Sequence, residues 1–165
     1  MPEHPGADAT IEVPDRLAAS ESCAVVWDDA FADYDFGPFH PMAPVRLTLT
    51  RDLALAGGLL DRPGVEVIGA DAATDEQLAA VHDPPYIEAV RRASGPHAAV
   101  APDELISFGI GGDDVPPFPG MHAASALIAG ASVAGIEAIR SGRSTRAVNI
   151  AGGLHHARPG AASGF

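Results

Sequence analysis

Apolar and polar positions along the chain follow two periodicities, which predict short strands separated by helices. Compact apolar runs occupy Cys23–Trp27, Val65–Ile68 and Arg146–Ala151. Apolar runs of this length, bounded by turn-forming or charged residues, are typical of buried strands in a parallel sheet. The segments between them are longer and contain apolar residues at helical spacing. The pattern therefore favours an α/β fold with a mainly parallel sheet.

The intervening segments carry specific helix signals. Pro44 suits the first position of a helix, and the apolar residues that follow at three- and four-residue steps predict one face packed into the core: Val45, Leu49, Leu53, Ala56 and Leu60. Thr74 to Gln77 matches a capping box, and Asp83 followed by Pro84 predicts the start of a further helix. For His82, just before that start, we expect a structural role rather than a catalytic one.

A long helix is predicted over Pro119–Arg140, and Gly142 is suited to end it. Its buried face is expected to consist of small and apolar residues: Met121, Ala124, Ile128, Ala131, Gly135 and Ala138. Glycine and proline are frequent in residues 94–120, for which we expect an irregular segment. Within it, Asp113 and Asp114 fit either a rigid, exposed carboxylate loop or a solvated turn.

The first 22 residues differ in character from the rest of the chain. Residues 1–22 are rich in proline and acidic side chains and show no periodicity, so a flexible tail is expected. They lack the basic start and apolar stretch of a signal peptide. Residues 23–165 are then expected to form the folded part.

Composition narrows the classes of function. The chain has 165 residues, of which 47% are hydrophobic, enough for one domain with a core. The formal net charge of −12 argues against a nucleic-acid partner and is compatible with cationic ligands. Cys23 is the single cysteine, which excludes an internal disulfide and favours a cytoplasmic location. The longest uncharged run, Met121–Ile136, is short and rich in small residues, so no membrane partner is expected.

Two adjacent histidines follow the last predicted strand. Its end at Ala151 leads through Gly152 and Gly153 to His155 and His156. In open α/β sheets, ligands bind beyond the carboxyl ends of strands, so this order places two imidazoles where a site is expected. The glycines allow a sharp turn and the close approach of a ligand. On the dipeptide alone, however, two solvated loop histidines are the more common situation.

The surrounding segments change that balance. Residues 152–165 resemble the active-site motif of the histone deacetylase family, including its bacterial acetoin-utilisation branch, and residues 37–46 and 110–120 resemble two further motifs of the family. Phe39 departs from the pattern, because the family usually has glycine there, and a glycine with positive φ would not accept phenylalanine without strain. The resemblance implies a three-layer α/β/α fold of the arginase/deacetylase type, incomplete in this chain, with residues 23–165 as the N-terminal part of a deacetylase catalytic domain.

The resemblance also implies a reaction and roles for individual residues. The family hydrolyses the amide of N-acetyl-lysine, and His155 and His156 would be its general base and general acid. Asp114 would hydrogen-bond the backbone of the acetylated substrate. The remaining matched residues would line or shape the channel around the lysine methylenes: Arg46, Gly152, Gly153, Gly164 and Phe165.

A metal ion is part of this expectation. In the family a metal, usually zinc, activates water, and its Asp–His–Asp ligands follow the segment that ends here at Phe165. No such set follows in this chain, so the ligands for zinc, or for iron, are expected beyond Phe165. The chain is accordingly expected to be an N-terminal fragment that neither binds zinc tightly nor turns over substrate.

Three functions remain open at this point. The first is a zinc-dependent deacetylase that acts on acetylated proteins. The second is an acetylpolyamine amidohydrolase, whose small cationic substrate would suit the acidic surface equally well. The third is a truncated, non-catalytic module that binds acetylated or basic ligands or pairs with another chain. The sequence gives no basis for an oligomeric state.

Overall fold

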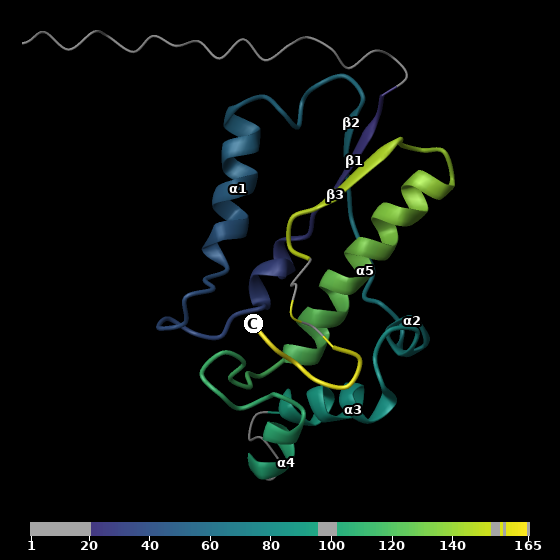
Figure 1. Ribbon diagram of the computed structural model, residues 1–165. Helices are drawn as coiled ribbons and strands as arrows, with labels where there is room; N and C mark the ends of the chain where they lie inside the picture. The colour runs from purple at the N-terminus through teal and green to yellow at the C-terminus, as the bar shows by residue number, and fades with distance from the viewer. Residues whose placement is uncertain (1–20, 96–101, 153–155, 157, 165) are drawn as a thin grey trace, which may run out of the picture.

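A parallel sheet forms the centre of the molecule. The computed structural model describes residues 21–95, 102–152, 156 and 158–164. Three strands lie in the order β2–β1–β3, with these bounds: β1 Cys23–Val26, β2 Val65–Ile68 and β3 Arg146–Asn149. Both pairings of β1 are parallel. The three predicted strands and the parallel α/β sheet are confirmed (Figure 1).

One face of the sheet is covered by α5, Met121–Arg140, which packs along β1 and β3 (Figure 1). The predicted buried face is confirmed for five of its six positions, and Ile128 is half-buried: Met121, Ala124, Ala131, Gly135 and Ala138 are buried. Small residues here let the helix lie close to the strands. By length and composition α5 could cross a membrane, a test that the core helix of a soluble protein also passes, and 33% of this stretch is buried inside the molecule.

The predicted burial of the first helix is wrong. This helix, α1, spans Val45–Ala56, yet Val45, Leu49 and Leu53 are 54%, 61% and 75% exposed. Leu47 is the residue that is buried, because α1 packs mainly on the short 3-10 helix η1, Asp29–Asp33, rather than over the sheet. The helical spacing identified a helix but not the side that packs.

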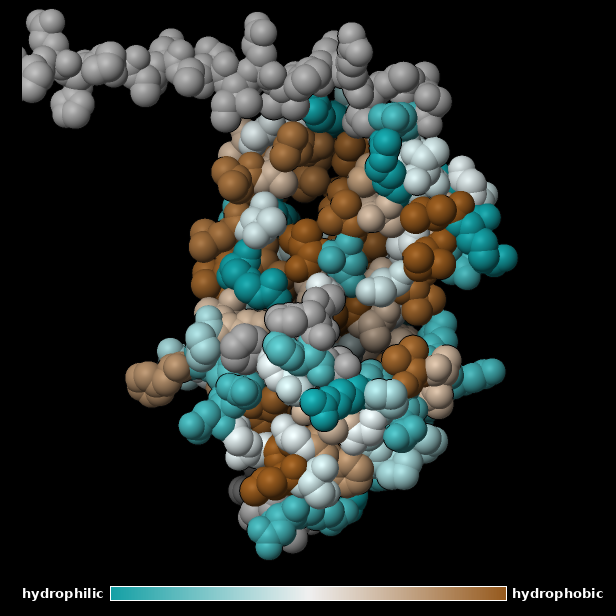
Figure 2. Space-filling view, in the orientation of Figure 1, coloured by the Kyte–Doolittle hydropathy of each residue, from teal (hydrophilic) through white to brown (hydrophobic). Residues whose placement is uncertain are grey.

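The same packing leaves a groove beside the sheet. It has a volume of about 580 Å³ and lies between α1 and the strand face that α5 does not cover. Figure 2 shows apolar side chains gathered over α1 and the strands, with a hollow between them. Val67 and Val148 contribute to this face and are 48% and 41% exposed.

Three shorter helices complete the described chain: α2 Asp75–Ala79, α3 Pro84–Ala93 and α4 Pro102–Ser107. The capping box is confirmed, since Thr74 Oγ1 accepts from the Gln77 amide at 3.3 Å and Gln77 Oε1 accepts from the Thr74 amide at 2.9 Å. Helix α4 lies in the segment that we expected to be irregular. Its first turn contains Asp103 and Glu104, which favour a helix start.

A second apolar cluster joins α3 and α4 to the start of α5. Its buried members are Ala93, Leu105, Ile110, Val115 and Met121. Residues 1–20, most of the expected tail, lie outside the described residues. Of the remaining two, Ser22 accepts hydrogen bonds from the Thr145 and Arg146 amides, and Glu21 pairs with Arg146 at 3.0 Å.

Candidate functional site

The two segments with the strongest motifs begin at the same edge of the sheet. Strand β1 leads into η1 and then into residues 34–46, whereas β3 leads into residues 150–164. Because β1 and β3 are neighbouring parallel strands, their carboxyl ends lie side by side. This is the edge at which open α/β sheets bind ligands.

A cavity of about 230 Å³ lies where these segments meet. Arg46 and Gly152, which come from the two different motifs, both line it. The rest of its lining is mostly apolar and comes from the chain between η1 and α1, from α1, from α5 and from the turn after β3: Tyr34, Met42, Pro44, Leu47, Ser125, Ile128, Ala129, Ser132 and Ala151. Two of the predicted channel residues are therefore brought together in one cavity.

Asn149, which the sequence analysis did not single out, forms hydrogen bonds with three residues that line this cavity. Its Nδ2 donates to the Ile128 carbonyl at 3.1 Å and to Ser132 Oγ at 3.0 Å, and its Oδ1 accepts from the Ala151 amide at 3.1 Å. A Cβ on Gly152 would lie 2.9 Å from Asn149 Nδ2. The amide thus ties the turn after β3 to α5, and glycine is needed at position 152 for that approach.

The predicted rim loop is held by a histidine. His40 Nε2 lies 3.2 Å from the Asp114 carbonyl oxygen, and His40 Nδ1 accepts from the Met42 amide at 3.1 Å. Since Nδ1 accepts, the proton lies on Nε2, which donates to Asp114. Next to it, Val115 is buried in the second cluster while the Asp114 side chain is exposed. This arrangement presents the carboxylate on an anchored loop.

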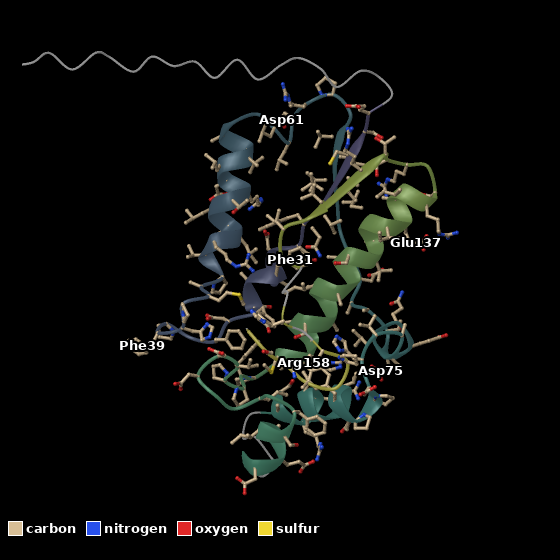
Figure 3. The ribbon with its side chains drawn as sticks, viewed as in Figure 1. Phe31, Phe39, Asp61, Asp75, Glu137 and Arg158 are labelled. Carbon is tan, nitrogen blue, oxygen red and sulfur yellow. The ribbon has the colours of Figure 1, made fainter. Side chains whose placement is uncertain are left out.

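Phe39 does not crowd the loop in which it replaces the family's usual glycine. Its side chain is 99% exposed and points away from the molecule (Figure 3). By contrast, Phe31 of η1 is fully buried in the main apolar cluster, and Figure 3 shows it inside the molecule. The phenylalanine at position 39 therefore projects into solvent and takes up no space in the candidate site.

His156 and Gly164 lie in direct contact. Gly164 has a φ of +68°, and a Cβ built on it would lie 2.4 Å from His156 Cδ2 and 2.8 Å from His156 Cγ. His156 is exposed. The other predicted site residues of this segment, Gly153, His155 and Phe165, lie outside the described residues.

Within residues 21–95, 102–152, 156 and 158–164, no three histidine, cysteine, aspartate or glutamate side chains come together as a metal site.

Tyr34 lines both the 230 Å³ cavity and a second cavity of about 140 Å³. Tyr86 also lines the second cavity. Burial, with Tyr86 as a lesser cause, raises the pKa of Tyr34 to about 12 from an ordinary value of 10.

The raised pKa of Tyr34 predicts that stability depends on pH. Because the folded state holds the phenol proton of Tyr34 more tightly than the unfolded state does, the stability present below pH 10 should fall as pH rises toward 12. Urea unfolding of wild type and Tyr34→Phe across this range measures it. An identical loss of stability in both proteins would contradict the assignment.

Comparison with known proteins places these features in a family. Residues 40–165 match the family model for the histone deacetylase domain. This chain belongs to the histone deacetylase family. The match includes the segments of His40, Arg46, Asp114 and His156, and enzymes of this family are generally metal-dependent. It agrees with the expected arginase/deacetylase type of α/β fold.

Several curated relatives are similar over most of the chain. The chain is 36% identical over 142 residues to the acetoin utilization protein AcuC of Staphylococcus aureus (strain MRSA252), covering 86% of this chain and 36% of the relative. It is 34% identical over 140 residues to the protein of the same name from Bacillus subtilis (strain 168), covering 85% and 35%. The chain therefore spans about a third of the length of these relatives.

Proposed function

We propose that this chain is part of a deacetylase of the acetoin-utilisation type that hydrolyses the amide of N-acetyl-lysine in proteins. The observation that carries the proposal is the cavity lined by both Arg46 and Gly152, at the sheet edge from which the His-His segment departs. Its mainly apolar lining suits the methyl and methylene groups of an acylated amine. Its location at the carboxyl ends of the strands suits a reaction site.

In this proposal the chain supplies the proton-transfer and positioning groups. His155 and His156 act as general base and general acid, because an imidazole can accept a proton from water and donate one to the leaving amine. Asp114, on its anchored loop, accepts hydrogen bonds from the substrate backbone. Gly164 and Phe165 line the entrance channel, and Arg46 with Gly152 and Gly153 forms its base.

The metal requirement and the substrate class are separate parts of the proposal. We propose zinc as the metal, with iron as the alternative, held by side chains other than those described above. An acetylpolyamine would also suit the net charge of −12, so the substrate class is decided by assay. A single cysteine such as Cys23 is typical of proteins in a reducing environment. We therefore propose a cytoplasmic location.

The test is an assay of the natural full-length protein, freed of metal and reconstituted with zinc or iron(II). We expect it to release acetate from an acetyl-lysine peptide, to lose this activity to a chelator, and to recover it when zinc is restored. If an acetylated polyamine is hydrolysed faster than the acetyl-lysine peptide, the proposed substrate becomes the small amine instead of a protein. Tight binding of acetylated peptide without any acetate release, with either metal, would overturn the enzymatic proposal in favour of a binding module.

A further inference from the structure

The segment after His156 is attached to the body of the molecule at two places. At the first, residues 158–161 form a turn closed by the Arg158 amide, which donates to the Ala161 carbonyl at 3.2 Å. The Asp83 amide donates to the Pro159 carbonyl at 2.9 Å, and His82 Nδ1 lies 3.2 Å from the Arg158 carbonyl oxygen. Two successive carbonyls of the turn are thus held by two successive residues at the start of α3. Figure 3 shows Arg158 on the segment that crosses in front of the lower end of α5.

The second attachment is to the end of α4. The Ala162 amide donates to the Phe108 carbonyl at 2.8 Å, and Ala162 packs against the second apolar cluster. Gly109 lies directly beneath Ala162, since a Cβ there would be 2.1 Å from the Ala162 carbonyl oxygen. Only Ser163 separates this anchored residue from Gly164, which contacts His156. The position of Gly164 against the imidazole therefore depends on how the turn is held.

His82 supplies the side-chain bond among these four hydrogen bonds, whereas the other three join backbone groups. A carbonyl oxygen only accepts, so His82 Nδ1 must carry a proton and donate it. The ring is half-buried and lies against Tyr86, with 5.3 Å between the ring centroids. The imidazole is thereby fixed in the orientation in which it reaches Arg158.

We propose that His82 is a positioning residue: its Nδ1–H holds the Arg158 carbonyl and so sets the path by which residues 158–164 return to His156. As far as catalysis is concerned, this rests on the proposed deacetylase function. The structural part stands independently, because it concerns the hydrogen bond and the ordering of the segment. The competing explanation is that His82 only fills space beside Tyr86.

Two substitutions distinguish these explanations, because each keeps one property of the histidine, its ring or its hydrogen-bond donor, and removes the other. His82→Phe keeps an aromatic ring against Tyr86 and loses the donor, whereas His82→Asn loses the ring and keeps a donor, since the amide nitrogen of asparagine can take the place of Nδ1. A positioning role predicts that asparagine is the better replacement. A packing role predicts that phenylalanine is.

The first measurement is amide hydrogen exchange of the natural full-length protein over residues 158–164, with α5 as internal reference. We expect His82→Phe to speed exchange of this segment about tenfold or more and to leave α5 unchanged, with His82→Asn close to wild type. Exchange in His82→Phe equal to wild type, or equally fast in both variants, would overturn the proposal.

The second measurement is the hydrolysis of an acetyl-lysine peptide. We expect His82→Phe to lower kcat about tenfold with a smaller change in KM, and His82→Asn to restore most of kcat, because the displaced group acts in proton transfer rather than in binding. A kcat of His82→Phe equal to wild type would overturn the positioning role. If the wild type itself releases no acetate, the proposed function fails, and the exchange measurement still decides whether His82 orders the segment.

Discussion

Gly164→Ala is expected to lower kcat for acetyl-lysine hydrolysis by about 100-fold, within the range that general acid–base groups contribute. The new methyl group would lie 2.4 Å from His156 Cδ2 and 2.8 Å from Cγ, too close for the imidazole to keep its position. Movement of the ring displaces the proton that His156 must deliver. The rate of the chemical step should therefore fall more than the affinity for substrate. Steady-state kinetics of the full-length, metal-loaded protein measure both.

The control for this substitution is Gly58→Ala. Gly58 has a φ of +64°, close to the +68° of Gly164, but a Cβ there meets nothing within 4 Å. Both variants therefore carry the same backbone strain of about 1–2 kcal/mol for a left-handed residue, and only one has the contact with His156. If the two variants have equal kcat, the loss comes from the strain and the proposed role of Gly164 beside His156 is incorrect.

The strands and α5 could be predicted because their signals are local. A short run such as Val65–Ile68, rich in β-branched residues, indicates a strand by its composition and length, although only Ile68 of it is buried in the structure, and the apolar length of α5 indicates a helix. The face of α1 could not be predicted in this way. Its periodicity at Val45, Leu49 and Leu53 indicates an apolar side, but the described part of the chain places η1, rather than the sheet, against a different side.

The candidate site shows the same difference between features that local sequence predicts and features that depend on long-range contacts. Motif resemblance identified Arg46, Asp114 and His156, whose side chains are recognisable by type and spacing. It did not identify Asn149, whose role is to bond three groups from α5 and the following turn, and it gave His82 no more than a structural role. These functions depend on contacts between residues far apart in sequence, such as His82 with Arg158. Sequence pattern alone carries no information on such pairings.

Gly130→Ala is expected to destabilise the protein by about 3 kcal/mol or more, at the upper end of what overpacking costs. The loop before α2 crosses α5 here, and the Ala73 amide donates to the Ala126 carbonyl at 2.8 Å. A Cβ on Gly130 would lie 1.9 Å from the Asp71 carbonyl oxygen and 2.7 Å from the Ala73 nitrogen. Both are backbone atoms, so no side-chain rotation relieves the clash, and loop and helix must separate.

Gly135→Ala provides the comparison within the same helix. Both substitutions gain about 1 kcal/mol of helix propensity, but the nearest atom at position 135 is Ala147 Cβ at 3.1 Å, where a small shift suffices. We therefore expect Gly135→Ala to stay within about 1 kcal/mol of wild type in urea unfolding. Equal stability of the two variants would mean that the loop at Asp71 does not approach α5 as closely as described. A selective loss in Gly130→Ala would establish that this crossing, rather than helix propensity, requires glycine at position 130.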